Sequence, residues 1–143
     1  MFSLSLNENE VEPFVAQISK DSGAMIILRI HSKKYVNIFT LSFHDMRGKP
    51  LTEVYYEDNA PNLLYNGQII PKPTNLFRPD ATNFVIFRTR KDTVDFIVGE
   101  KPVLSMSAHA AGATVMIDGL DVRNFVMVPG IEETKTQYIA SKN

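Results

Sequence analysis

The chain has 143 residues, a formal net charge of −1, and neither cysteine nor tryptophan. Its length suits one domain with one core, and 44% hydrophobic with 22% charged residues predicts a folded body. The scattered, nearly balanced charge gives no basis for a nucleic-acid partner or for attachment to acidic membranes, and without cysteine there are no disulfides or thiolate metal sites.

The N-terminal sequence MFSLSLNENEVEPF contains no basic region followed by a long apolar run. No segment approaches the roughly 20 apolar residues that cross a bilayer, so we expect no membrane insertion. We expect a cytoplasmic or nuclear protein, although unconventional export leaves no mark in a sequence. Residues 1–6 alternate like an edge strand, which we expect to pair within the chain rather than with a partner.

Short strands are predicted along most of the chain. Residues 24–30 (AMIILRI) alternate with the period of two that is typical of a strand. Residues 36–43 (VNIFTLSF) place three apolar side chains on one face, with Thr40 and Ser42 on the opposite face. Further strands are expected between turn-rich segments, at residues 52–56, 62–65 and 84–88. Strands this short and evenly spaced indicate an all-β sandwich or barrel.

The stretch from residue 92 to residue 128 is predicted to form a β-meander. Apolar residues alternate in residues 94–98, and the sequence GEKP at 99–102 then reverses the chain into a strand around residues 103–106. Residues 105–114 contain Gly112 and show no apolar stripe, so we expect a loop there.

A second antiparallel strand pair is expected at the end of this stretch. Residues 115–117 run into Asp118-Gly119, a strong turn sequence, and alternating apolar residues return in residues 122–127. The pattern therefore predicts a hairpin around Gly119.

The order of these landmarks resembles the galectin family, which are β-galactoside-binding lectins. Pro13-Phe14, followed by Gly23 and residues 26–30, resembles the opening pattern P-F…G-x-x-I-x-I. Phe39-Thr40-Leu41-Ser42-Phe43 resembles F-x-I-x-L, and Ile117-Asp118-Gly119 resembles I-x-G. Residues 84–86 correspond to the strand before the hairpin, and residues 94–99 are similar to F-x-V-x-V-N-G without its Asn.

The resemblance covers roughly residues 11–128 and implies an all-β fold, a two-sheet antiparallel β-sandwich of the galectin-like jelly-roll type. Residues 1–130 are then a single domain. Residues 131–143 form a polar C-terminal tail, which we expect to be mobile.

The sugar-binding signature of the family is largely missing. Galectins carry H-x-N-x-R on one strand of the concave sheet, where alignment places Tyr55, Glu57 and Asn59 of this chain. Leu64-Tyr65-Asn66 fits the next motif, V-x-N, but the Trp of W-x-x-E-x-R is absent. Because a galactose ring packs on an aromatic plane and needs matched polar groups, ordinary β-galactoside binding is not expected.

The resemblance nevertheless implies an altered ligand face at these positions. Tyr55 offers an aromatic surface, Glu57 an acceptor, and Asn59 and Asn66 two amides, with Leu64 beside them.

Two of these positions have structural interpretations that compete with ligand binding. Asn66-Gly67 stands between the apolar pairs 63–64 and 69–70, so a hairpin turn is favoured over a sugar-binding amide. Glu57-Asp58 could hold a cation, but adjacent acids at a strand end are usually a solvated turn, and no metal site is expected.

No catalytic pattern stands out. His31, His44 and His109 are far apart in the sequence, and no nucleophile elbow or phosphate-binding glycine loop is present. We therefore predict no enzyme activity, no catalytic residue and no cofactor.

Two functions remain open. The chain is either a carbohydrate-binding protein with a non-standard ligand face, or a galectin-like sandwich that has lost sugar binding. In the second case it would act as a protein–protein interaction module or form a homodimer through a sheet face or an edge strand. The partner is accordingly a glycan or a protein, and an open Tyr55 favours a glycan whereas a covered one favours an interface.

Overall fold

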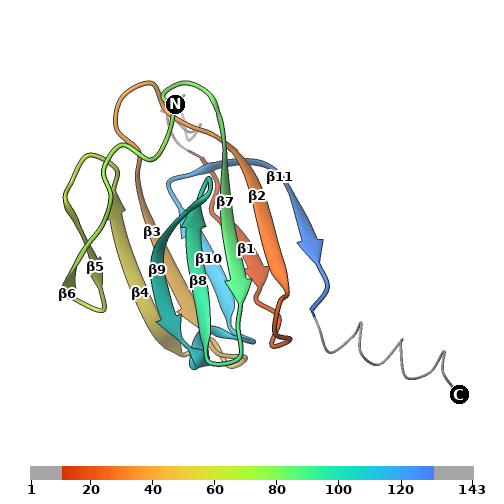
Figure 1. Ribbon diagram of the computed structural model, residues 1–143. Coiled ribbons are helices and arrows are strands. Elements are labelled where there is room, and N and C mark those ends of the chain that lie inside the picture. The colour runs from red at the N-terminus through yellow and green to blue at the C-terminus, as the bar shows by residue number, and fades with distance from the viewer. Residues whose placement is uncertain (1–10, 131–143) are drawn as a thin grey trace, which may run out of the picture.

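The computed structural model describes residues 11–130, which form two antiparallel sheets packed face to face (Figure 1). The six-stranded sheet has, in spatial order, β1 (Phe14–Gln17), β10 (Thr114–Asp118), β3 (Ile38–His44), β4 (Pro50–Glu57), β5 (Asn62–Tyr65) and β6 (Gln68–Pro71). The five-stranded sheet has β11 (Asp121–Val128), β2 (Met25–His31), β7 (Thr82–Thr89), β8 (Thr93–Val98) and β9 (Lys101–Ser107). The predicted all-β, two-sheet sandwich is confirmed.

The predictions for residues 1–6 and for the tail at residues 131–143 lie outside the described residues. Within the described residues, no helix is long and apolar enough to cross a membrane.

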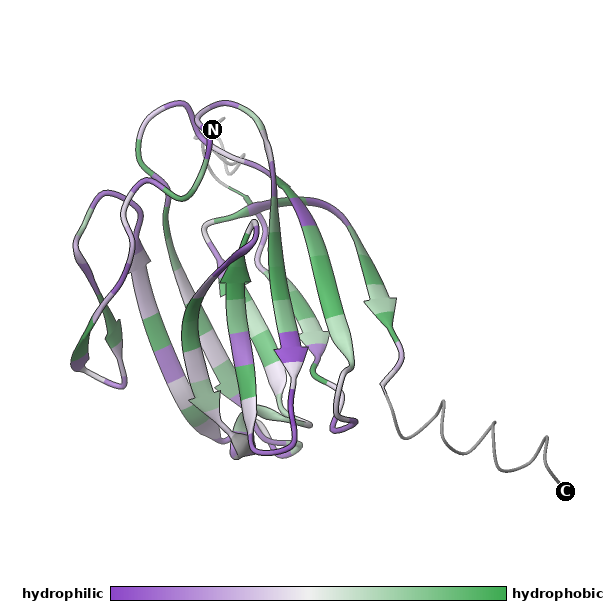
Figure 2. Cartoon of the chain, viewed as in Figure 1, coloured by the Kyte–Doolittle hydropathy of each residue, from purple (hydrophilic) through white to green (hydrophobic). Residues whose placement is uncertain are grey.

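The core lies between the sheets and is built by the alternation of side chains along each strand. Figure 2 shows hydrophobic and hydrophilic residues alternating along the strands. At its centre the Phe39 and Tyr56 rings of the six-stranded sheet stack with centroids 4.5 Å apart, and Phe87 stacks on Phe96 in the other sheet at 5.7 Å. Phe96 meets Phe39 edge to face at 6.0 Å, so aromatic contacts join the two sheets.

The predicted meander is correct only for its first part. Strands β7, β8 and β9 are sequential neighbours in the five-stranded sheet. The expected hairpin at Asp118-Gly119 is wrong, because β10 pairs with β1 and β3 while β11 pairs with β2 in the opposite sheet. Val115 and Ile117 of β10 are buried in the core, whereas Phe125 and Met127 of β11 are about half exposed. A turn sequence between two apolar strands fits a crossing between sheets as well as a hairpin, so the local pattern alone cannot tell them apart.

Gly119 makes that crossing tight. Its φ is +111°, and a Cβ at this position would lie 2.5 Å from the carbonyl oxygen of Ile38. The loop expected at residues 105–114 is also shorter than predicted, because β9 continues to Ser107 and the 3-10 turn η1 (Ala108–Ala110) follows it.

The five-stranded sheet contains one buried carboxylate, Asp95 on β8. The Ser105 hydroxyl donates to Oδ1 at 2.8 Å, Arg88 Nη2 donates to Oδ2 at 3.0 Å, and Arg90 Nε lies 2.7 Å from the same oxygen. Burial by itself raises the pKa of Asp95, but the hydrogen bonds from Ser105 and Arg88 and the charges of Arg90 and Arg88 outweigh it, so its pKa lies below the ordinary value.

We predict that Asp95→Asn lowers the free energy of unfolding by about 2 kcal/mol, because both arginines lose their charged acceptor. The lowered pKa means that this stabilisation is present above the ordinary carboxyl pKa of 3.8 and is lost as the pH falls through the lower value in the folded chain. Urea unfolding from neutral to acidic pH measures the difference in free energy of unfolding between the wild type and Asp95→Asn. The matched control is Asp92→Asn, at an exposed position. A difference that stays constant to the lowest pH at which the protein folds would contradict this assignment.

Candidate functional site

A groove lies on the outer face of the six-stranded sheet, the face turned away from the core. Its volume is about 450 Å³. Side chains from β3, β4 and β10 form most of its walls, joined by the turn after β5. The lining residues are Thr40, Ser42, His44, Pro50, Leu51, Thr52, Glu53, Asn66 and Met116. We call this the outer-face groove.

Strand register explains why these side chains gather. Met116 on β10 lies directly opposite Ser42 on β3, and Ser42 lies opposite Glu53 on β4. The residues between them on each strand, such as Leu41 and Val54, are fully buried in the core. A thioether, a hydroxyl and a carboxylate therefore stand side by side across three strands, which gives the groove both apolar and hydrogen-bonding surface.

Tyr55 and Leu64 lie beside the groove on the same outer face. Tyr55 is opposite Thr40 on one side and Leu64 on the other, and Leu64 is opposite Ile69 on the edge strand β6. The three apolar side chains are 39%, 40% and 68% exposed, in the order Tyr55, Leu64, Ile69. We call these three residues the apolar row. Two of the predicted ligand residues are thus neighbours, and Tyr55 is open to solvent.

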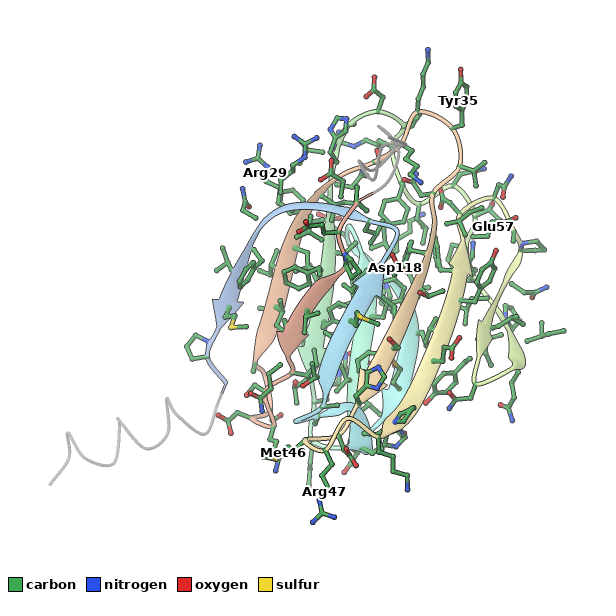
Figure 3. All side chains as sticks on the ribbon, turned by 180° about the vertical axis from the view of Figure 1, so that it is seen from behind. Arg29, Tyr35, Met46, Arg47, Glu57 and Asp118 are labelled. Carbon is green, nitrogen blue, oxygen red and sulfur yellow. The ribbon has the colours of Figure 1, made fainter. Side chains whose placement is uncertain are left out.

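Glu57 and Asn59 lie farther along the chain from Tyr55. Glu57 is the last residue of β4 and is paired with Ile38, so it shares the outer face (Figure 3). Asn59 follows in the exposed turn after the strand. It lies past the end of the sheet face and does not line the groove.

Asn66 occupies the turn between β5 and β6, as the hairpin interpretation predicts. Its φ is +50°, and the following Gly67 has a φ of +80°. The Asn66 Oδ1 accepts a hydrogen bond from the Glu53 backbone N–H at 2.8 Å, and the Asn66 N–H donates to the Glu53 carbonyl, also at 2.8 Å. Asn66 therefore fastens the hairpin to β4 while its side chain lines the outer-face groove.

A buried polar cluster fixes the loops at the other end of β4. The Tyr56 hydroxyl donates to Asp58 Oδ1 at 2.9 Å, and the Leu76 N–H donates to the same oxygen at 3.0 Å. Lys72 Nζ donates to the carbonyls of Asp58, Ala60 and Pro73 and lies 4.5 Å from the centroid of the Tyr56 ring. The expectation of a solvated turn is wrong for Asp58, which is 6% exposed.

The cluster alters the proton affinities of its members. Burial, then the negative charge of Asp58 and the hydrogen bond to it, raises the pKa of the Tyr56 hydroxyl far above its ordinary value. Burial lowers the pKa of Lys72, although the charges of Asp58 and Glu57 oppose this. Tyr56 stays neutral over the physiological range, so the cluster is an anchor for the loops.

The histidines do not come together in the described residues. His31 Nε2 lies 3.0 Å from Asp80 Oδ1 at one end of the sandwich. His109 lies 2.6 Å from both the Thr52 and the Ser107 hydroxyls, and His44 lines the outer-face groove. Within residues 11–130, no three His, Asp or Glu side chains are placed to hold a metal ion together.

Five polar groove residues are not among the predicted ligand residues: Thr40, Ser42, His44, Thr52 and Glu53. The signal was present, because Thr40 and Ser42 fall on the face of their strand opposite three apolar residues. Alternation alone does not single out a groove, because the groove depends on β10 lying next to β3, and strand order between distant segments is not visible in the sequence.

No protein-family model matches this chain, and no curated protein matches its sequence. Solved structures of galectins do resemble it. Galectin LEC-6 of Caenorhabditis elegans superposes with a TM-score of 0.59 at 11% identity, covering 85% of this chain and 94% of that chain.

Two further galectin-fold structures match similarly. CG-16, a homodimeric agglutinin from chicken liver, has a TM-score of 0.58 at 9% identity and covers 82% of this chain and 100% of its own. Toad ovary galectin in complex with thio-digalactose has a TM-score of 0.57 at 8% identity, covering 80% and 98%. The fold of this chain is therefore galectin-like, as the sequence landmarks predict.

We predict that Asn66→Ala lowers the free energy of unfolding by about 1 to 2 kcal/mol, because alanine is strained at positive φ and cannot bond to the Glu53 N–H. Asn66→Gly should cost about half as much, since glycine adopts this φ without strain. Urea denaturation of the two variants beside the wild type measures both effects. Equal losses would show that the positive φ carries no cost for alanine here.

Proposed function

We propose that this galectin-like sandwich is a carbohydrate-binding protein whose ligand lies in the outer-face groove and on Tyr55. The observation that carries the proposal is the groove itself, where hydroxyls, an imidazole, an amide and a carboxylate line a hollow of about 450 Å³ beside an open aromatic ring. Sugar hydroxyls need such mixed donors and acceptors, and the apolar face of a sugar ring packs on aromatic or aliphatic surface.

The fold supports this proposal by analogy. One structure with the same fold, toad ovary galectin, is a complex with thio-digalactose. The present chain has no tryptophan and lacks the H-x-N-x-R motif, so we propose a specificity different from ordinary β-galactoside binding. Thr40, Ser42 and Glu53 are the polar contacts, and Tyr55 is the ring platform, with Glu57 within reach of a longer ligand.

Charge narrows the class of sugar. None of the six strands of this sheet contains lysine or arginine. Glu53, Glu57 and Asp118 are the acidic residues of these strands, and all three alternate with buried residues and so face outward. A neutral sugar pays no electrostatic penalty on such a face, whereas a sulfated or carboxylated one is repelled. We therefore propose a neutral glycan as the ligand of the groove.

The apolar row favours a second candidate function. Tyr55, Leu64 and Ile69 extend apolar surface from the groove to β6, the edge strand of this sheet among the described residues. Exposed apolar rows of this kind also suit a protein partner or a second copy of the chain, and CG-16, which has the same fold, is a homodimeric agglutinin. In that case the row would be covered by protein and the groove would bind no sugar.

A glycan array followed by calorimetry separates the two candidates. We predict that the chain binds a neutral glycan, and that Tyr55→Ala lowers the affinity about tenfold, which is a loss of about 1.4 kcal/mol, because the ring platform is removed. Ser42→Ala should weaken binding to a smaller extent, since one neutral hydrogen bond is lost.

Phe84→Ala is the matched control. Phe84 is 45% exposed on β7 of the opposite sheet. The Phe84→Ala variant therefore loses an aromatic ring of similar exposure far from the groove, and its affinity for the glycan should equal that of the wild type. The carbohydrate proposal fails if no glycan binds or if Tyr55→Ala and Ser42→Ala both bind like the wild type. A concentration-dependent dimer that Ile69→Glu dissolves would then support the second candidate.

A further inference from the structure

A second hollow lies at one end of the sandwich and is larger than the outer-face groove. Its volume is about 610 Å³. The loop between β2 and β3 forms one wall, the turn between β10 and β11 another, and Asp80 before β7 a third. Tyr35 marks this end in Figure 3, and Met46 and Arg47 mark the opposite end. We call this hollow the end pocket.

The loop that lines the end pocket is held by buried polar residues. Ser32 is 1% exposed, and its hydroxyl donates to the Ala81 carbonyl at 3.0 Å. Asn37 is 2% exposed, and its Oδ1 accepts from the Lys33 N–H at 2.9 Å, which closes the loop. The backbone of residues 33–36 is thereby fixed at both ends, and its side chains extend outward from an anchored frame.

The cations and carboxylates of the pocket do not balance. His31 lies 3.0 Å from Asp80, and Arg123 lies 2.8 Å from Asp121, so both pocket carboxylates already have a basic partner. Lys33 and Lys34 also line the pocket, and among residues 11–130 neither has an ion pair with a carboxylate. With histidine neutral, Lys33, Lys34 and Arg123 face Asp80 and Asp121, so the lining of the pocket has a net positive charge of one.

An open aromatic ring stands beside these charges. The Tyr35 side chain is 82% exposed, and Lys34 Nζ lies 5.8 Å from the centroid of its ring. An aromatic ring of this exposure offers the apolar surface on which a sugar ring packs. An inorganic anion has no apolar face that could pack on it. The combination of two ammonium groups and a ring suits a ligand that carries an anion on a ring.

We propose that the end pocket binds an acidic sugar, with Lys33 and Lys34 contacting its sulfate or carboxylate and Tyr35 packing on its ring. This site is separate from the outer-face groove. The proposal depends on the proposed carbohydrate-binding function only in assuming that the ring of the ligand is a sugar. The two sites divide ligands by charge, because the strands of the groove sheet contain acids without lysine or arginine, whereas the lysines of the end pocket form no ion pair among residues 11–130.

Calorimetry and amide NMR of the full chain with sulfated lactose, lactose and inorganic sulfate test this proposal. We expect saturable shifts at residues 33–35 with sulfated lactose, and much smaller ones with lactose or sulfate at equal concentration. Replacing both lysines (Lys33→Ala with Lys34→Ala) should raise the dissociation constant for sulfated lactose about tenfold, and added salt should weaken wild-type binding. Tyr35→Ala should also weaken it.

The opposite end of the sandwich supplies the control. Arg47 and Lys49 are both exposed there, and Met46 is 91% exposed, so Arg47→Ala with Lys49→Ala removes the same charge and Met46→Ala removes a comparable open side chain. Neither control should alter binding of sulfated lactose.

Three outcomes would overturn the proposal: no shifts at residues 33–35, equal affinity for inorganic sulfate and sulfated lactose, or equal losses in the control variants. In the same titrations, shifts at Ser42 and Glu53 with lactose would indicate binding in the outer-face groove and would not bear on the end pocket. The two sites can therefore fail independently.

Discussion

The aromatic contact between the two sheets is the constraint from which the rest of the molecule follows. Phe39 and Tyr56 stack in one sheet, Phe87 and Phe96 stack in the other, and edge-to-face contacts join the pairs. Side chains alternate between the two faces of a strand. Because Phe39 and Tyr56 face the core, Thr40, Ser42 and Tyr55 on the same strands face outward. The candidate ligand face is thus a consequence of how the core packs. Tyr56 has two structural roles, because its ring packs in the core and its hydroxyl donates a hydrogen bond to Asp58.

Much of this arrangement was predictable from the sequence, and the failures have a common physical cause. Alternation identified the strands and their buried faces, and Asn66-Gly67 identified the hairpin, because these signals are local. The partner of β10 was not predictable, since Ile117 faces the shared core whether its strand joins one sheet or the other. The outer-face groove requires β10 beside β3, so the same missing information hid Ser42 and Glu53 as site residues. Alignment with the family motif placed Tyr55 and Leu64 on one face, and the strand register pairs them directly.

The outer-face groove and the end pocket differ in the charge of the residues around them. The strands of the six-stranded sheet contain acidic residues but neither lysine nor arginine, while the loop between β2 and β3 brings Lys33 and Lys34 to the end pocket. A net charge of −1 for the whole chain conceals this separation. Local charge has more influence on ligand choice than the total, because fields from exposed groups are screened within about 10 Å in ordinary salt. The galectin-like fold supplies the scaffold, and the side chains placed on it differ from the family motif at most sugar-binding positions.

Amide NMR spectra of the full chain, recorded during titration with a panel of neutral mono- and disaccharides, show whether the outer face of the six-stranded sheet binds a neutral sugar. If the outer-face groove binds a neutral glycan, at least one neutral sugar should produce saturable shifts concentrated at Thr40, Ser42, Glu53 and Tyr55, on the outer face of the six-stranded sheet. Shifts confined to other surfaces, or no saturable shift with any sugar of the panel, would contradict this proposal and would favour the apolar row as a protein interface.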